Sequence, residues 1–243
     1  MSTRLSRGGR LIDRARPMAF TFNGKPMRGF ASDSLAAALL ANGQVLMGRS
    51  FKYHRPRGVV GSGAEEPNAL VNLGRNARQE PDQRVTTTEL FDGLEATSQN
   101  HWPSLEFDIG VLNNAVSKML PAGFYYKTFM APRAAWKHLF EPVIRQAAGL
   151  GTAAKEADPD RYEQTYAYCD VLIAGGGVAG LAAALKAGQE GKRVLVMEMT
   201  PHWGGRAPVD GGLIEGQEPQ AWIDAQLAAL AKLPNVRLMP RTM

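Results

Sequence analysis

Apolar and polar positions alternate near the start of the chain in a pattern that predicts a pair of strands. Within residues 18–23, Phe20 and Phe22 alternate with smaller or polar neighbours, so an extended segment would have one apolar face. Asn23 and Gly24 form a hairpin turn signal, and residues 25–31 return as a second strand. The pattern therefore predicts a β-hairpin over residues 18–31.

A short helix is expected after this hairpin. Residues 35–41, LAAALLA, are strong helix formers, with Ser32 and Asp33 as capping residues before them and Asn42-Gly43 as a stop signal after them. The glycine-containing segment 45–73 predicts a loop with short strands, and residues 85–90 predict a further strand. This order of elements is typical of a small β-grasp domain.

The composition changes after residue 100. Residues 105–120 and 134–148 have helical composition, and the aromatic stretch 124–129 lies between them. The polar segment 149–160, GLGTAAKEADPD, is typical of a linker. We therefore expect a β-grasp domain at 1–100, a helical connector and linker at 101–160, and a third domain at 161–243.

The third part of the chain carries the clearest pattern. An apolar run at 171–174 leads into the glycine turn 175–180, GGGVAG; a helical segment reaches residue 189, and a second apolar run, 194–197, ends on Glu198. Strand, glycine turn, helix, strand and terminal acid in this order are the dinucleotide-binding βαβ fingerprint. We therefore expect the start of a Rossmann-type domain, in a chain whose fold class combines α/β and α+β parts.

Each residue of the fingerprint has a physical role. Gly175 permits the tight turn, Gly177 lets a pyrophosphate approach the backbone, and Gly180 lets the helix pack closely on the strand. Unpaired helical N–H groups and the helix dipole attract the pyrophosphate. Glu198 follows at about the expected spacing of roughly 20 residues, where a carboxylate accepts hydrogen bonds from a ribose diol and repels a 2′-phosphate. The pattern favours NAD or FAD over NADP; the alternative is a glycine turn that only packs a helix.

A second glycine pair, Gly204-Gly205, precedes Arg206. A turn there would bring the chain back over the nucleotide, and Arg206 would reach the pyrophosphate; the alternative is an ordinary loop. Because this doublet is common in flavoprotein folds with two dinucleotides, NAD and FAD both remain open.

The last part of the chain predicts a helix at 221–233 and a strand at 235–239. A doubly wound sheet built on this βαβ unit needs more strands to bury both faces. We therefore expect the chain to be the N-terminal part of a longer protein.

The composition of the chain indicates a globular protein with a basic N-terminus. The 243 residues are 44% hydrophobic, enough for one large or two modest cores, and carry a formal net charge of +5. We interpret the basic N-terminus as a solvated or subunit-facing arm, with a targeting segment or an anionic ligand as alternatives; its arginines are Arg4, Arg7, Arg10, Arg14 and Arg16.

The sequence gives no support for several common kinds of site or partner. No apolar run approaches the ~20 residues of a membrane span, and we expect neither a membrane nor a nucleic-acid partner. The one cysteine, Cys169, allows no disulfide within the chain and fits a cytoplasmic protein. The four histidines are scattered, so no metal site is expected.

Several strings of the sequence resemble the N-terminal region of the alpha subunit of heterotetrameric sarcosine oxidase. In chain order they are GRSFKYHRPRG, EEPNALV, LPAGFYYKTFM, PRAAWKHLFEP, DPDRYEQTYAYCDVLIAGGGVAGLAAAL and the GGR doublet. They span most of residues 10–241, and strings of this length are not expected to match by chance.

Part of this resemblance concerns a loop that carries cysteines in related proteins. Related subunits of cyanide-forming and amino-acid-oxidising dehydrogenases have a plant-type C-x4-C-x2-C run here, which ligates a [2Fe–2S] cluster. In this sequence the spacing falls on Val60, Glu65 and Asn68, none of which is a thiolate. The resemblance implies a ferredoxin-like β-grasp domain without cluster cysteines that acts as an interaction module. The basic residues of the loop are Arg49, Lys52, Arg55 and Arg57. They would serve subunit docking or interdomain ion pairs, with a phosphate or nucleic-acid site as the alternative.

The resemblance also implies an activity for the complete enzyme, which would be an oxidoreductase acting on the CH–NH group of sarcosine. It would form glycine and pass the N-methyl carbon on as formaldehyde or to tetrahydrofolate. Electrons would pass from an FAD held mainly by the beta subunit to an FMN at the alpha–beta interface, and oxygen would be reduced to hydrogen peroxide. Beta, gamma and delta subunits would complete the heterotetramer.

Within this chain the implied residues are nucleotide ligands, and no catalytic residue is expected. The cofactor-binding set for NAD, or for FAD at the same place, is Gly175, Gly176, Gly177, Ala179, Gly180, Glu198, Met199, Thr200, Gly205 and Arg206. The second assignment is the FAD-binding subunit of a dye-linked or opine-type amino-acid dehydrogenase, against which the missing cysteines count. A non-catalytic scaffold subunit that carries a nucleotide is the third.

Overall fold

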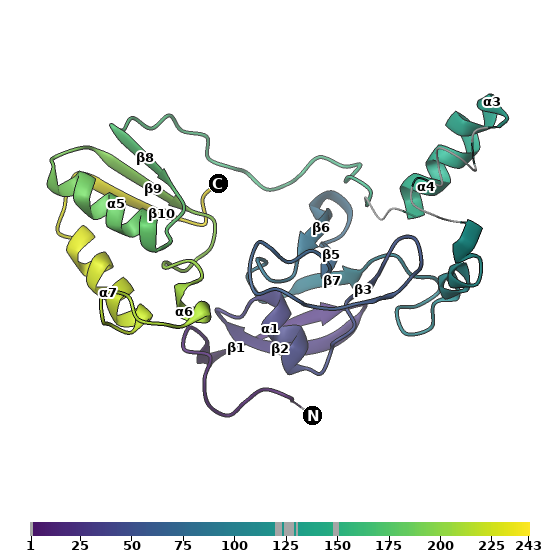
Figure 1. Ribbon diagram of the computed structural model, residues 1–243, viewed down its shortest axis with the longest axis horizontal. Helices are drawn as coiled ribbons and strands as arrows, with labels where there is room; N and C mark the ends of the chain where they lie inside the picture. Colours follow the sequence, from purple (N-terminus) through teal and green to yellow (C-terminus); the bar gives the residue numbers. More distant parts are fainter. Residues whose placement is uncertain (1, 120–122, 124–128, 130, 148–150) are drawn as a thin grey trace. The chain divides into compact units, whose positions relative to one another are not determined.

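The computed structural model describes residues 2–119, 123, 129, 131–147 and 151–243 (Figure 1). The chain divides into two compact units, one that ends at Arg161 and one that spans Tyr162–Met243. Each unit has its own cluster of buried apolar side chains, so each has its own core.

The first unit is built on a five-stranded mixed sheet with the strand order β2-β1-β7-β5-β6. The expected hairpin is confirmed, because β1 and β2 pair antiparallel around Asn23 and Gly24, and β7 runs parallel to β1. The strands are β1 (Asp13–Phe22), β2 (Lys25–Ala31), β5 (Leu70–Leu73), β6 (Glu80–Arg84) and β7 (Leu94–Ser98).

Helix α1 (Leu35–Ala41) packs against this sheet and has the bounds that the sequence predicts. Its N-cap is Ser34, whose hydroxyl accepts the N–H of Ala37 at 3.2 Å. The expected capping pair is therefore wrong. Ser32 takes a left-handed φ of 68°, and Asp33 is buried in an ion pair.

That ion pair corrects the interpretation of the basic N-terminus. The Arg4 guanidinium binds both carboxylate oxygens of Asp33, at 2.9 and 2.6 Å, and lies over the ring of Phe30. The N–H of Thr3 also donates to the carbonyl of Ala41. Arg4 is thus held against α1 and is not part of a solvated arm.

The core of the first unit comes from alternate strand positions and from one face of α1. Burying one large apolar side chain stabilises a fold by about 1.5–3 kcal/mol. The fully or almost fully buried members of the core of the first unit include Phe20, Phe22, Leu35, Leu39, Met47, Val71, Leu90 and Leu94.

The strand expected at residues 85–90 is wrong. Val85 and Leu90 are buried, but β6 ends at Arg84 and a turn follows. Strand β7, which the sequence pattern did not single out, pairs with β5 on the side opposite β6. The apolar residues of segment 85–90 are thus buried without being in a strand, because pairing with neighbouring strands decides which residues are extended.

Short elements fill the rest of the first unit. The predicted loop with short strands is confirmed, since β3 (Gly48–Arg49) pairs with β4 (Pro56–Arg57). The 3-10 helices η2 (Ile109–Asn114) and η3 (Ser117–Met119) replace the helix expected over 105–120. The helix expected over 134–148 is a continuous run of α3 (Arg133–Ala135), the π-helical η4 (Trp136–Phe140) and α4 (Glu141–Ala147). A further 3-10 turn, η1 (Asn76–Arg78), lies between β5 and β6.

Two further sequence expectations concern the connector. The aromatic stretch 124–129 lies outside the described residues except for Phe129, whose ring centroid is 4.9 Å from that of Phe140. Residues 151–169 have no regular secondary structure and are mostly exposed, as expected for a linker; residues 149 and 150 are not described.

The second unit is a three-stranded parallel sheet with the order β10-β9-β8 (Figure 1). This is the order of the first three strands of a doubly wound dinucleotide-binding fold. Helix α5 joins β8 to β9, and α7 precedes β10, in the predicted sequence of elements. The bounds are β8 (Val171–Ala174), α5 (Val178–Gln189), β9 (Val194–Glu198), α6 (Ala207–Asp210), α7 (Pro219–Leu230) and β10 (Val236–Pro240).

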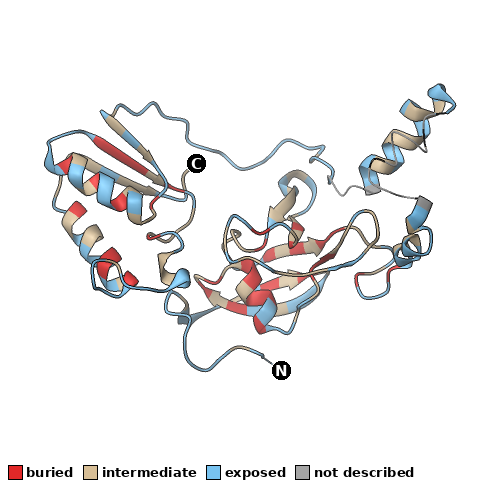
Figure 2. Cartoon of the chain, in the orientation of Figure 1, coloured by how far each residue is buried: buried red, intermediate tan, exposed pale blue. Residues whose placement is uncertain are grey.

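One face of this sheet forms the core of the unit. Val194 and Val196 of β9 pack with Leu181 of α5 and with Trp222 and Ile223 of α7. Figure 2 shows buried positions on β9, α5 and α7. This packing fixes the carboxyl ends of β8 and β9 beside the start of α5, which is where the glycine turn lies.

Candidate nucleotide-binding site

The glycine turn joins the carboxyl end of β8 to the first turn of α5. Gly175 has a φ of 102°, a left-handed conformation that glycine adopts without steric cost. Its N–H donates to the carbonyl of Met197 at 2.7 Å, so the turn is held on β9.

Helix α5 comes very close to this turn at Gly180. A Cβ atom on Gly180 would lie 2.0 Å from the carbonyl oxygen of Gly175 and 3.3 Å from the Ile173 side chain. No side chain fits there, which agrees with the close helix–strand packing that the fingerprint assigns to this glycine.

Gly177 is the N-cap of α5 and faces open space. Its backbone is extended, and a Cβ atom placed on it would meet no heavy atom within 4 Å. The N–H groups of Val178, Ala179 and Gly180 follow, and the first N–H groups of a helix have no partner within it. Such a helix start, with room in front of it, attracts a phosphate group.

Glu198 ends β9 next to this turn, and it is 7% exposed. Its Oε2 accepts the N–H of Gly176 at 2.7 Å, and its Oε1 accepts the N–H of Thr200 at 2.9 Å. The Thr200 hydroxyl also donates to Oε1, at 2.9 Å. Because each carboxylate oxygen can accept two hydrogen bonds, Oε1 is filled by Thr200 and Oε2 keeps one acceptor position. The acid is thus oriented by the loop that it would serve.

The second glycine pair folds back onto the first. The N–H of Gly204 donates to the carbonyl of Gly176 at 2.8 Å, and a Cβ atom on Gly205 would lie 3.2 Å from the Cα of Gly177. The two glycine segments are therefore in direct backbone contact, as the expected return of the chain requires.

Trp203 is a residue of this site that sequence reasoning missed. A Cβ atom on Gly176 would lie 2.2 Å from the Trp203 ring and 3.3 Å from the Cβ of Glu198. The indole therefore packs against the residue whose N–H binds Glu198. The available signal was an aromatic residue directly before a glycine pair.

Two residues of the predicted set lie at the edge of the site. Met199 follows Glu198 and is 45% exposed. The Arg206 guanidinium pairs with the Asp210 carboxylate one helical turn away, at 2.7 Å, and both side chains are about half exposed. Such exposed pairs contribute only about 0–1 kcal/mol to stability.

The basic loop of the first unit is engaged in internal contacts. Arg49 donates to the carbonyl of Leu105 at 2.9 Å, and His54 Nδ1 lies 2.7 Å from Asp108 Oδ2. Burial raises the pKa of Asp108, but hydrogen bonds from the Trp102 N–H and from His54 outweigh it and hold that pKa below its usual range. Part of the basic string thus fastens the loop to residues 102–110.

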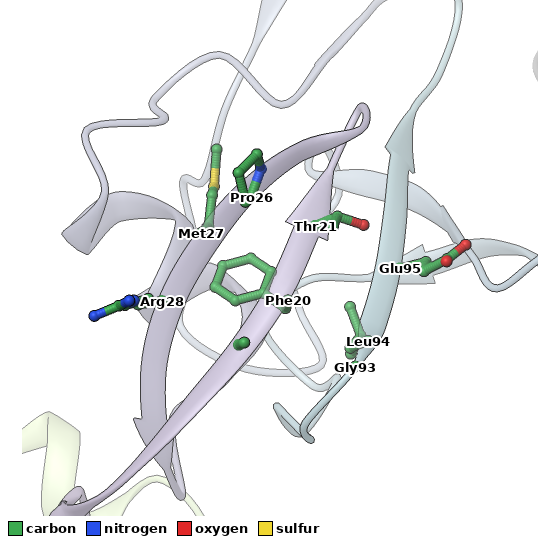
Figure 3. A pocket seen from close by; sticks show the side chains of 9 residues that line it. Phe20, Thr21, Pro26, Met27, Arg28, Gly93, Leu94 and Glu95 are labelled. Carbon is green, nitrogen blue, oxygen red and sulfur yellow. The ribbon is translucent and has the colours of Figure 1, made fainter.

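A groove of about 570 Å³ lies along β1, β2 and β7 of the first unit (Figure 3). Thr21 is the register partner of both Pro26 and Glu95, so these three positions share one face of the sheet. No helix start that would hold a phosphate is among its lining residues. These are Gly93 and the strand residues Ala19, Phe20, Thr21, Pro26, Met27, Arg28, Leu94 and Glu95.

Among the described residues, no group of three or more His, Cys, Asp or Glu side chains is placed to hold a metal ion. The helices of the same residues include none that is long and apolar enough to cross a bilayer.

Two segments of the chain match known families. Residues 15–101 match a 2Fe-2S iron-sulfur cluster binding domain, and residues 170–221 match the FAD dependent oxidoreductases. Among solved structures, L-proline dehydrogenase from P. horikoshii is similar, with a TM-score of 0.53 and 18% identity, over 94% of this chain and 34% of that one. The last comparison supports the fold alone.

Longer relatives cover nearly the whole chain. It is 54% identical to sarcosine oxidase subunit alpha of Rhizobium meliloti, over 99% of this chain and 24% of the relative. It is 33% identical to the subunit of the same name from a Corynebacterium species, over 95% of this chain and 19% of the relative. The chain thus spans about a quarter or less of these relatives, and over nearly its whole length it is homologous to sarcosine oxidase alpha subunits.

Proposed function

We propose that this chain is the N-terminal portion of the alpha subunit of a sarcosine-oxidising flavoprotein, and that its glycine turn holds an adenine dinucleotide. The observation that carries the proposal is the start of α5, where Gly177 faces open space beside the acid at the end of β9. Homology to sarcosine oxidase alpha subunits supports the reaction class, oxidation of a secondary amine.

The residues at this turn fit the parts of such a ligand. Gly177, Ala179 and Gly180 would receive the pyrophosphate at the helix start, with Gly175 and Gly176 shaping the turn. Glu198 would accept the adenosine ribose hydroxyls through the free position on Oε2. Met199 and Thr200 would line the adenine side, and Gly205 and Arg206 would close the site from the returning chain.

We propose NAD as the dinucleotide, in line with the resemblance to the sarcosine oxidase alpha subunit. FAD is the second candidate, because residues 170–221 match FAD dependent oxidoreductases, and Glu198 suits the ribose of either. When bound, a nicotinamide or flavin ring supplies hydride-transfer chemistry. The residues of this chain would bind and orient the nucleotide and would not act as general acids or bases.

The rest of the proposed enzyme lies outside this chain. Beta, gamma and delta subunits would complete a cytoplasmic heterotetramer, with FAD and FMN elsewhere in the complex. The reaction would convert sarcosine to glycine, form hydrogen peroxide from oxygen, and deliver the methyl carbon as formaldehyde or to tetrahydrofolate.

The decisive experiment is on the intact subunit purified with its partners. The complex is denatured, and the released nucleotides are identified by chromatography and mass spectrometry. NAD together with FAD and FMN is the expected result. FAD without NAD would move the chain to the amino-acid dehydrogenase type of subunit, and a folded complex without any nucleotide would show that the turn only packs a helix.

A further inference from the structure

Residues 58–69 form a loop whose backbone N–H groups converge on one carboxylate. Glu66 Oε2 accepts the N–H groups of Val60 and Gly61, at 2.7 and 2.6 Å. Glu66 Oε1 accepts those of Asn68 and Ala69, at 2.8 and 3.1 Å. Because Glu66 is only 1% exposed, one enclosed anion ties the two ends of the loop together.

The electrostatics of the loop keep this side chain ionised. Burial by itself raises the pKa of Glu66, because it disfavours the charged form. The four N–H donors of the loop outweigh that effect, and the pKa lies below its usual value. Glu66 therefore carries a negative charge at neutral pH.

The same loop holds a cluster in other members of its fold. Residues 15–101 match a 2Fe-2S cluster binding domain, and the C-x4-C-x2-C spacing falls on Val60, Glu65 and Asn68. Concave sets of backbone N–H groups bind anions, and they surround many iron–sulfur clusters in this way. The loop thus keeps the amide geometry of an anion site.

The side chains of the loop do not fit a cluster. Val60 is apolar and 70% exposed, the Glu65 carboxylate accepts the N–H groups of Ser62 and Gly63, and Asn68 accepts a bond from Arg57. A [2Fe–2S] cluster needs thiolate ligands, with histidine as the known substitute. The chain has one cysteine, Cys169, and it lies in the other unit.

We propose that the Glu66 carboxylate is a built-in anion that replaces an iron–sulfur cluster as the organiser of this loop, so that the first unit keeps its fold without iron and carries no electrons. The proposal goes beyond the nucleotide function, which concerns the second unit. It also means that the loop amides are already satisfied and offer no phosphate site.

The first test compares two neighbouring carboxylates in the assembled enzyme. Glu66→Gln keeps the size of the side chain, but a carboxamide accepts on one atom only, and its NH2 group would face two N–H donors. Glu65→Gln is the matched control, because Glu65 also accepts two loop N–H groups but is exposed. The readout is amide hydrogen exchange, by mass spectrometry, in peptides spanning residues 58–70.

We expect exchange in this loop to be at least about tenfold faster in Glu66→Gln than in the wild type, and to change by less than about threefold in Glu65→Gln. Equal effects of the two substitutions would overturn the proposal. If Glu66→Gln does not assemble, Glu66→Asp keeps the charge on a shorter side chain. Its loop should exchange faster than that of the wild type, and exchange at the wild-type rate would contradict the assigned role.

The second test asks directly for iron. Iron and acid-labile sulfide are measured on wild-type enzyme purified without oxygen, and we expect neither in stoichiometric amount. About two irons and two sulfides per alpha subunit, the content of one cluster, would overturn the proposal. Nucleotide released from Glu66→Gln should equal that of the wild type, so failure of the nucleotide assignment can be told apart from failure of this one.

Discussion

Two loops of this chain direct backbone N–H groups at a buried glutamate, and they differ in what remains open. In the first unit, Glu66 accepts four N–H groups on its two oxygens. In the second unit, Glu198 accepts the N–H groups of Gly176 and Thr200, while the neighbouring Gly177 faces open space. One loop is completed by its own side chain, and the other keeps room for a ligand.

The difference follows from where each acid stands in the chain. Glu66 belongs to the loop that it binds, so its carboxylate reaches the centre of the loop. Glu198 lies at the end of a neighbouring strand, 22 residues from Gly176, and touches only one flank of the turn. Converging amides therefore do not by themselves identify a binding site; an acceptor already inside the loop closes it.

Filling the open loop of the second unit should weaken nucleotide binding more than any other change. Gly177→Val should lower the affinity for the dinucleotide by more than about 100-fold, or about 3 kcal/mol, because its side chain occupies the space at the helix start. The extended backbone of Gly177 accepts any residue, so folding and assembly should be retained. Released nucleotide and circular dichroism measure the two properties.

A second glycine of the same turn is the contrast for this prediction. Gly180→Ala places a Cβ 2.0 Å from a carbonyl oxygen and should lose fold and nucleotide together. Full nucleotide occupancy in Gly177→Val would place the ligand somewhere else.

A smaller effect is expected from removing the flanking acid. Glu198→Ala should weaken nucleotide binding by about 1.5–3 kcal/mol, the value of hydrogen bonds to a charged group. Titration calorimetry of nucleotide-stripped enzyme measures it. Glu190→Ala, which removes an exposed acid after α5, is the control and should leave the affinity unchanged; an unchanged affinity in Glu198→Ala itself would move the ribose contact to another residue.

Lowering the pH should have the smallest effect, and it concerns the stability of the loop that Glu66 closes. The folded pKa of Glu66 lies below its usual value, so its ionisation stabilises the fold above the unfolded pKa of about 4.3. That contribution is lost as the pH falls through the folded pKa. The difference in unfolding free energy between wild type and Glu66→Gln should therefore be constant from pH 7 to about pH 5 and shrink below that. Urea titrations at several pH values measure it, and a gap that widens in acid would contradict the assignment.

Local patterns predicted much of the fold. The hairpin, α1 and the β8–α5–β9 unit follow from short-range periodicity and glycine turns. They lie at or near the predicted bounds, apart from β1, which begins at Asp13 rather than at residue 18. The predictions at 85–90 and 105–120 were wrong because those segments are shaped by distant partners. His54, for example, lies against Asp108, 54 residues away, and leaves no room for a side chain at Gly110.

Residue order alone was enough to predict that a glycine turn, a helix and a terminal acid follow one another in the second unit, since these features depend on neighbours along the chain. The absence of thiolates at Val60, Glu65 and Asn68 was equally visible in the sequence. The folded structure was needed to show that Glu66 fills the loop that those positions line, and that Trp203 packs on Gly176. Both depend on how folded loops bring backbone and side chains together in space, which residue spacing does not encode.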